Sequence, residues 1–163
     1  MIEIDFDGDD FAEWADDFAA ELEINVPQAF RNGLDAVVAR AKELAPVGQK
    51  RTPDGPTGLL KNSIQRVGPT GSVASGTLEG AVEAGAPYAA AVEYGTKPHE
   101  IRPRFRRALR WPVQGGFGFA KKVQHPGTRA QPFLGPALEQ KADEVVAELE
   151  AAVELSALRA DRK

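Results

Sequence analysis

The stretch that decides the fold is His125-Pro126-Gly127-Thr128-Arg129-Ala130-Gln131-Pro132-Phe133-Leu134-Gly135-Pro136-Ala137-Leu138. Its prolines fix φ and remove backbone donors, so it forms a rigid connector rather than a flexible one. It leads directly into the longest helical pattern of the chain, and Pro132 or Pro136 suits the first helical position. Phe133 and Leu134 are its large apolar residues, and we expect them to enter the core. The stretch contains no catalytic pattern.

The helix that follows should pack through one apolar stripe. Leu138, Ala142, Val145, Leu149 and Ala152 recur at helical spacing between acidic residues. We expect the chain to fray from about Ala157, so that residues 157–163 are poorly ordered.

The first part of the chain also has helical spacing. Apolar residues recur from Phe11 to Leu22 and again from Phe30 to Leu44, and the pattern stops at Pro46. Pro27 lies between the two runs, so it either kinks one long helix or starts a second one. Residues 1–10 read as a poorly ordered acidic lead-in.

Loops and two strands are predicted for residues 46–84. Residues 46–58 form a long loop, which in a compact domain is usually functional or disordered. A short turn at residues 59–62 precedes a strand at residues 63–67, and small residues at 68–76 predict a loop. Residues 77–84 alternate as a half-buried strand does.

A short helix is predicted from Pro87 to Tyr94, ended by Gly95 in the left-handed conformation. We expect Val92 to pack inward. Glu93 and Tyr94 lie at the helix end, where a polar tip can reach solvent or a neighbour.

A β-hairpin is predicted between Ile101 and Val123. A three-residue loop, Gln114 to Gly116, would pair Val113 with Phe117 and Trp111 with Phe119 on one apolar face. The other face would be basic, with Arg110, Pro112, Ala120 and Lys122. On this register the aromatic rings pack and do not serve as stacking platforms.

Length and composition bound the fold. A chain of 163 residues with 42% hydrophobic and 27% charged residues is an ordinary soluble domain, so we expect residues 1–163 to form a single domain. No cysteine is present, which excludes disulfides and thiolate chemistry. No secretory signal or membrane span is expected. The fold class is α+β: an N-terminal helix or kinked helix pair, a small, mostly antiparallel sheet with a protruding β-hairpin, and a long C-terminal helix.

Charge is strongly segregated. Residues 1–23 contain ten acidic residues and no basic one, whereas residues 97–131 contain nine basic residues and one acid, Glu100. Such asymmetry indicates either nucleic-acid contact or two faces that meet between subunits. Because the predicted hairpin has its aromatic rings on the face opposite its basic residues, we favour contact between subunits over nucleic-acid binding. The acidic N-terminal helix is one candidate partner.

Catalytic patterns are missing. His99 and His125 each lie beside a proline without a second ligand at metal spacing. The segment from Gly55 to Lys61 lacks the glycine spacing of a phosphate loop, and no serine stands in a Gly-x-Ser-x-Gly elbow. We therefore expect no enzyme activity, no cofactor and no metal.

Four segments together resemble the tail-component (tail-completion, or head–tail joining) family of long-tailed bacteriophages. They are Ala45-Pro46-Val47; Thr57-Gly58-Leu59-Leu60-Lys61-Asn62-Ser63-Ile64; Pro87-Tyr88-Ala89-Ala90-Ala91-Val92-Glu93-Tyr94-Gly95-Thr96; and His125-Pro126-Gly127-Thr128 with Gln131-Pro132-Phe133-Leu134 and Pro136-Ala137-Leu138. They span residues 45–138 in the family's order. The acidic N-terminus and the end of the last helix lie outside them.

The resemblance implies a structural virion protein at the head–tail junction. It would form a ring, sixfold, around the DNA channel, between a head-completion or connector protein and the tail terminator or tail tube. The genome would pass through without sequence readout, and the protein would be made in the host cytoplasm. A tail-terminator role and a basic-hairpin DNA-binding protein remain alternatives.

Two groups of residues follow from this interpretation. We expect inter-subunit or inter-ring contacts from Arg104, Arg106, Arg107, Arg110, Gly115, Gly116, Phe117, Lys121 and Lys122. We assign to the fold the family-motif residues Thr57, Gly58, Tyr88, Glu93, Tyr94, Gly95, Thr96, His125, Pro126, Gly127, Thr128, Pro132 and Phe133. Substituting Tyr94 or Phe133 should therefore reduce solubility before it reduces docking.

Overall fold

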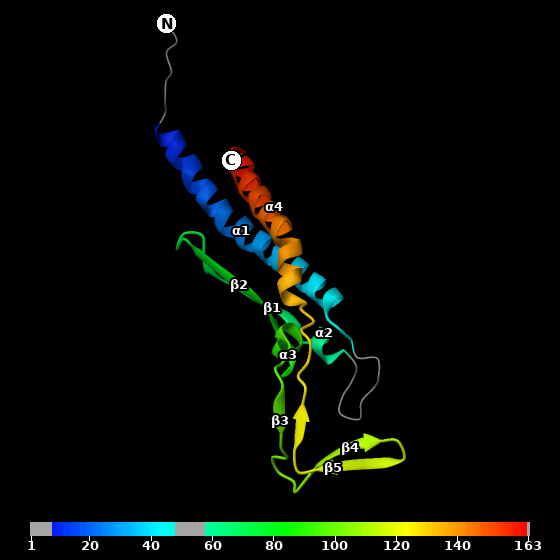
Figure 1. Ribbon diagram of the computed structural model, residues 1–163. Coiled ribbons are helices and arrows are strands. Elements are labelled where there is room, and N and C mark those ends of the chain that lie inside the picture. Colours follow the sequence, from blue (N-terminus) through cyan, green and yellow to red (C-terminus); the bar gives the residue numbers. More distant parts are fainter. Residues whose placement is uncertain (1–7, 48–57, 163) are drawn as a thin grey trace. The chain divides into compact units, whose positions relative to one another are not determined.

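The computed structural model describes residues 8–47 and 58–162. The fold is α+β as predicted, with a long N-terminal helix, antiparallel strand pairs and a long C-terminal helix (Figure 1). The chain divides into a helical unit, Met1–Ala86 with Phe133–Lys163, and an insert unit, Pro87–Pro132.

Helix α1, Gly8–Leu44, is one continuous helix with Pro27 inside it. The second alternative, a new helix starting at Pro27, is therefore wrong. Asp9 and Asp10 lie in the first turn, where carboxylates interact favourably with the positive end of the helix dipole. The predicted stop at Pro46 agrees with the observed end at Leu44. The loop predicted at residues 46–58 lies mostly outside the described residues.

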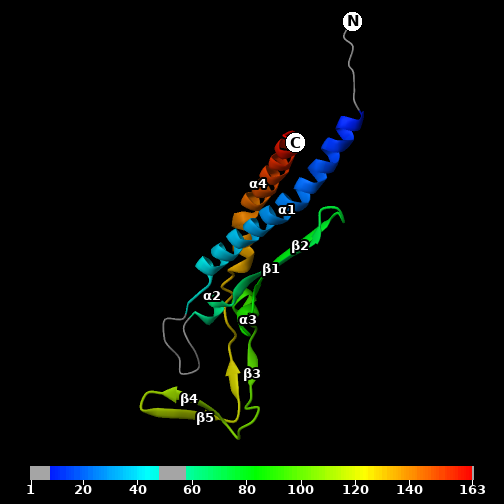
Figure 2. The same cartoon turned by 180° about the vertical axis from the view of Figure 1, so that it is seen from behind.

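Helix α4, Leu134–Ala160, packs along α1 in both views (Figures 1 and 2). Small residues allow the two helices to approach closely: Ala41 and Ala137 are fully buried. A Cβ built on Gly33 would lie 3.0 Å from Cγ1 of Val145. Because protein interiors are close-packed, a larger residue at Gly33 would push the helices apart.

Two details of α4 differ from the prediction. Leu138 is 56% exposed, and the buried line runs through Ala137, Ala152, Ser156 and Ala160. The face toward α1 is therefore made of smaller residues than the predicted stripe. The predicted fraying from Ala157 is wrong, because α4 continues to Ala160, which is buried.

Phe133 precedes α4 and is fully buried, which confirms its predicted role in the core. The helix begins one residue later, at Leu134, so neither Pro132 nor Pro136 is its first residue. Pro136 still lies in the first turn, where a missing N–H removes no intrahelical hydrogen bond.

A hairpin of β1, Ile64–Ser72, and β2, Thr77–Ala84, packs on α1. The prediction for Thr77–Ala84 is confirmed. The loop predicted at residues 68–76 is wrong in its first half, because β1 continues to Ser72 through a register shift between Val67 and Thr70. Gly68 at this shift has a φ of 86°, a conformation that glycine adopts without steric cost.

Two side chains and one glycine hold this hairpin on α1. Arg66 Nε lies 2.8 Å from Asp35 Oδ1, and Glu23 Oε2 accepts a hydrogen bond of 3.2 Å from the Val73 amide. A Cβ on Gly80 would lie 2.5 Å from Leu34 Cδ1, so a larger residue at this position of β2 would require the Leu34 side chain to shift. The short helix α2, Leu59–Asn62, precedes β1 as predicted.

A polar cluster lies between α1 and α4. Asn25 Nδ2 donates to Ser156 Oγ at 3.0 Å, and the fully buried Ser156 donates to the Ala152 carbonyl at 2.7 Å. Arg159 reaches both Asn25 Oδ1, at 3.2 Å, and Glu21 Oε2, at 3.4 Å. Since buried polar groups are costly unless paired, this cluster favours one register of the two helices.

Within the described residues, no helix combines the length and apolar character that crossing a membrane requires.

Candidate interaction surface

The insert unit is built around two of the motif segments, which lie about thirty residues apart in the sequence but are hydrogen-bonded to each other in the structure. Helix α3, Ala89–Tyr94, is followed by strand β3, His99–Ile101, which pairs with β6, Val123–His125. Thr96 and Thr128 exchange backbone hydrogen bonds of 2.9 and 3.1 Å. The Val92 carbonyl accepts a further bond of 2.8 Å from the Gln131 amide. The third and fourth motif segments therefore form one joint.

Two glycines make this joint possible. A Cβ on Gly95 would lie 2.6 Å from the Thr128 carbonyl oxygen, and one on Gly127 would lie 2.2 Å from that of Thr96. Both have positive φ, 71° and 89°. Gly95 ends α3 as predicted, but its ψ of −178° lies outside the left-handed helical region. Glycine is required at both positions for space as well as for conformation.

The end of α3 differs from the prediction. Glu93 is buried, whereas Val92 is only half-buried. Tyr94 is 82% exposed, as expected of a polar tip at the end of the helix, so it is not part of the buried core. The helix is too short for its apolar pattern to fix which side faces inward, and tertiary contacts decide the matter. Tyr94 is instead available for contact.

His99 and His125 are directly opposite in the β3–β6 ladder, with ring centroids 5.1 Å apart. Sequence reasoning did not pair them, because the long segment between them leaves the register of the two strands undetermined. His125 Nδ1 accepts a hydrogen bond of 3.1 Å from the Gly127 amide, which places the proton of the neutral ring on Nε2. Among the described residues, no group of three or more potential ligands is arranged for a metal ion.

The hairpin of β4, Leu109–Val113, and β5, Gly116–Ala120, has a different register from the predicted one. Val113 pairs with Gly116, so the connection is the two-residue turn Gln114–Gly115. Pro112 therefore faces Phe117, and Arg110 faces Phe119. One residue of slip moves a side chain to the other face.

The consequence is that the basic and aromatic faces coincide. The Arg110 guanidinium lies 3.5 Å from the centroid of the Phe117 ring, a cation–π contact. Phe117 is 52% and Phe119 66% exposed. The glycines at the turn that we expected at an interface, Gly115 with a φ of 84° and Gly116, have open space around them.

The loop before β4 extends this surface. Phe105 is 91% exposed and lies beside Arg104, whose guanidinium carbon is 5.5 Å from the ring centroid. A shallow hollow of about 500 Å³ is lined by Pro103, Arg104, Phe105, Arg106, Ala108, Leu109 and Arg110. We call Arg104, Phe105, Arg106, Arg110, Phe117 and Phe119 the arginine–aromatic surface.

The remaining cations of the predicted interface are exposed, but Lys122 already has a partner. Arg107 and Lys121 are exposed. Lys122 Nζ lies 3.4 Å from Glu100 Oε2, and Arg102 Nε lies 2.5 Å from Glu100 Oε1. The hydrogen bond from Arg102 lowers the pKa of Glu100, and Lys122 adds to the effect.

The remaining motif residues lie next to short helices or in the connector before α4. Gly58, with a φ of 99°, precedes α2, and Tyr88 precedes α3. Pro126 and Pro132 lie in the connector outside helices and strands. Thr57 lies outside the described residues.

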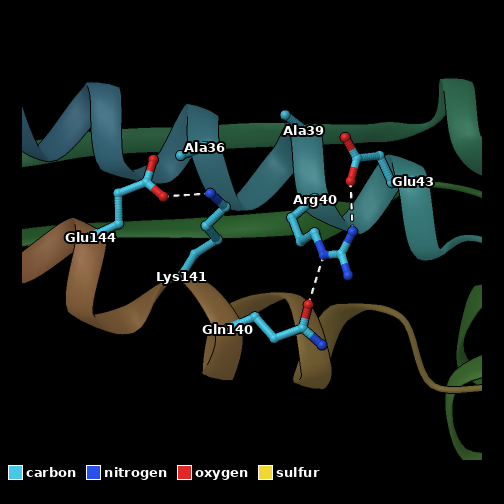
Figure 3. Close-up of a pocket in the computed structure, with 7 residues that line it drawn as sticks. All are labelled: Ala36, Ala39, Arg40, Glu43, Gln140, Lys141 and Glu144. Carbon is cyan, nitrogen blue, oxygen red and sulfur yellow. Dashed lines mark hydrogen bonds and ion pairs between the residues drawn. The ribbon is translucent and has the colours of Figure 1, made fainter.

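A second hollow, of about 480 Å³, lies between α1 and α4 (Figure 3). Its charged groups pair with one another: Arg40 bonds both Glu43 and Gln140 at 2.7 Å, and Lys141 pairs with Glu144. In Figure 3 these side chains point toward their partners across and along the two helices. This arrangement fastens the two helices together.

Comparison with protein-family models, with curated proteins and with solved structures gives no match for this chain.

Proposed function

We propose that this protein is a non-enzymatic structural component of the head–tail junction of a long-tailed bacteriophage, acting in tail completion. Copies form a ring, sixfold, around the DNA channel and join tail to head. The proposal starts from four sequence segments that resemble the tail-component family in the family's order.

One structural observation carries the proposal furthest. Two of these segments, residues 87–96 and 125–128, meet in the joint built by Thr96, Thr128 and the two positive-φ glycines. Two segments that resemble the family, and that lie far apart in the sequence, are thus hydrogen-bonded to each other in the structure. Chance similarities in separate loops would not be expected to converge in one hydrogen-bonded element.

The exposed surfaces suit a protein that works by contact. The insert unit presents the arginine–aromatic surface and the exposed Tyr94. Its partners would be further copies of the chain, a head-completion or connector protein, and the tail terminator or tail tube. The genome would pass through the ring without sequence readout, since positive charge alone contacts phosphates irrespective of sequence. The finished protein would be part of the virion.

A phage experiment tests this proposal. A stop codon at Trp14 in the phage genome that encodes the chain should yield DNA-filled heads beside separate tails in negative-stain electron microscopy. Supplying the intact chain from a plasmid should restore joined particles. Tails of faulty length would indicate the tail-terminator role, and intact infectious particles without the chain would refute the proposal.

A second candidate is a DNA-binding protein that uses the basic hairpin. The contact of Arg110 with Phe117, on the face that also carries Phe119, favours it more than the predicted register did. Exposed rings beside cations are typical of single-strand binding surfaces. Affinity for DNA that falls steeply with salt would support this candidate, because phosphate contacts release counterions.

A further inference from the structure

The arginine–aromatic surface combines positive charge with exposed apolar area. Three phenylalanines, Phe105, Phe117 and Phe119, are each more than half exposed. The backbone of duplex DNA could neutralise the arginines, but it would leave these rings in water. A protein surface that is both acidic and aromatic would cover the rings and neutralise the charge.

The chain itself has such a surface at the start of α1. Asp10, Glu13 and Asp17, with Trp14, Ala160 and Asp161, line a hollow of about 480 Å³. Trp14 is stacked between Phe11 and Phe18, with ring centroids 5.9 and 5.2 Å apart, and Phe11 is 53% exposed. We call this the acidic end of α1.

We propose that the arginine–aromatic surface of one copy docks on the acidic end of α1 of a second copy. Arg104 and Arg106 lie opposite the carboxylates, and Phe105 meets the Phe11–Trp14 stack. A guanidinium suits this setting because it bonds carboxylates through its planar edge and stacks on aromatic faces. The inference rests on the proposed self-assembly and names its contact.

The geometry of this contact is heterologous, since each copy uses one surface to bind and a different one to be bound. Such contacts generate closed rings when the rotation closes, and filaments otherwise. This arrangement explains why charge is segregated in the sequence, with ten acidic residues in residues 1–23 and nine basic ones in residues 97–131. It orients neighbouring copies in one direction around the assembly.

Disulfide trapping between two single-cysteine variants tests the contact, because the natural chain has no cysteine. Concentrated Phe105→Cys protein is mixed with Glu13→Cys protein under mild oxidation. The mixture should give a disulfide-linked heterodimer in higher yield than either variant alone. The matched control pairs Phe105→Cys with Glu139→Cys, an exposed residue near the start of α4. A yield no higher than that of the control overturns the inference.

Charge reversal gives a second readout, measured by sedimentation equilibrium. Arg104→Glu should lower the association constant by about tenfold or more, as loss of an interface arginine commonly does. Lys61→Glu, an equal charge change at an exposed site of α2, should leave it within about twofold. The double variant Glu13→Lys/Arg104→Glu should recover association. A double variant as weak as Arg104→Glu alone contradicts the pairing.

Competing results have separate outcomes. If Arg104→Glu weakens binding to a 30-mer of single-stranded or duplex DNA while the disulfide yield stays at the control level, the surface binds DNA and the inference is wrong. If particles fail to join without the chain but no heterodimer is trapped, the proposed function stands and this contact falls. If the heterodimer is trapped but particles join without the chain, the contact stands and the proposed function falls.

Discussion

At the scale of single residues, the joint of the insert unit depends on glycines more than on side-chain chemistry. Gly95 and Gly127 bring the two motif segments within hydrogen-bonding distance because a Cβ at either place would overlap a carbonyl oxygen. Sequence reasoning identified both as motif positions and expected positive φ at Gly95. It could not supply the close approach, which exists only after residues far apart in the chain meet.

Gly127→Ala tests this dependence. The new Cβ would lie 2.2 Å from the Thr96 oxygen at a φ of 89°, so we expect a loss of stability of roughly 3 kcal/mol or more, from left-handed strain plus overlap. The control is Gly76→Ala, where φ is 69° and nothing lies within 4 Å of the new Cβ. It should cost only about 1–2 kcal/mol. Chemical denaturation followed by far-ultraviolet circular dichroism measures both, and equal losses would contradict the close-approach argument.

Glu100 makes a pH-dependent prediction at the same scale. Its pKa is lowered below the ordinary 4.5, first by the Arg102 hydrogen bond. Because the folded-state pKa is depressed, the stabilisation is present above pH 4.5 and is lost as the pH falls through the lowered value. Carboxyl NMR should therefore place the Glu100 midpoint below 4.5. Arg102→Gln should move it upward, whereas Arg129→Gln, a matched change outside this contact, should not.

At the scale of elements, the sequence predicted which segments are helices and strands better than it predicted how they meet. Helical periodicity located α1 and α4, since long apolar patterns are strong signals. The predicted stripe of α4 is right at Ala152 and at Val145, which faces Gly33. It included the exposed Leu138 in place of the buried Ala137. A stripe of large residues usually marks the buried face, but here close approach at Gly33 favours small ones.

The predicted register of the β4–β5 hairpin was also wrong, because the sequence allows two turn lengths. Both a two-residue and a three-residue turn fit Gln114-Gly115-Gly116, and each leaves an alternating pattern on both strands. The choice decides whether Phe117 shares a face with Trp111 or with Pro112. The candidate surface therefore could not be composed correctly from the sequence, although its arginines could be named.

The interhelical polar cluster predicts a measurable coupling. Ser156→Ala removes the nearer of the two acceptors of the Asn25 amide, which also reaches Glu21 Oε2 at 3.4 Å, and should cost about 1–2 kcal/mol of stability. Asn25→Ala should cost a similar amount, and the double variant less than their sum, with a coupling of about 0.5–1 kcal/mol. Urea denaturation of the four proteins in the cycle measures it. Gln28→Ala, at an exposed residue of α1 whose side chain bonds neighbours along the same helix, serves as the control; full additivity would mean that the 3.0 Å contact does not stabilise the helix pair.

At the scale of the whole molecule, the two units differ in what their residues do. The helical unit contains most of the residues that stabilise the fold, whereas the insert unit contains the residues that we expect to bind partners. The helical unit contains the fully buried Phe133 and the α1–α4 packing, and most of the buried apolar residues belong to that unit. The insert unit contains the exposed arginines and aromatic rings, which do not contribute a core. Length alone predicted one domain, because composition does not reveal where contacts become sparse.

Replacing the hairpin segment tests this division. Ile101 and Val123 are opposite each other at the end of the β3–β6 ladder, so an Asn-Gly turn can join them in place of residues 102–122. The replaced segment carries seven basic residues and no acidic one. The shortened protein should keep its helical circular dichroism and unfold within a few degrees of the full chain. It should also lose self-association in sedimentation equilibrium and fail to restore particle joining in the phage that carries the stop codon. The full-length variant Gln114→Asn, which places an Asn-Gly turn between β4 and β5, should retain both activities. If the shortened protein still assembled, the contacts that build the ring would have to lie in the helical unit, where the exposed side of α4 around Leu138 and Val146 would be the next surface to vary.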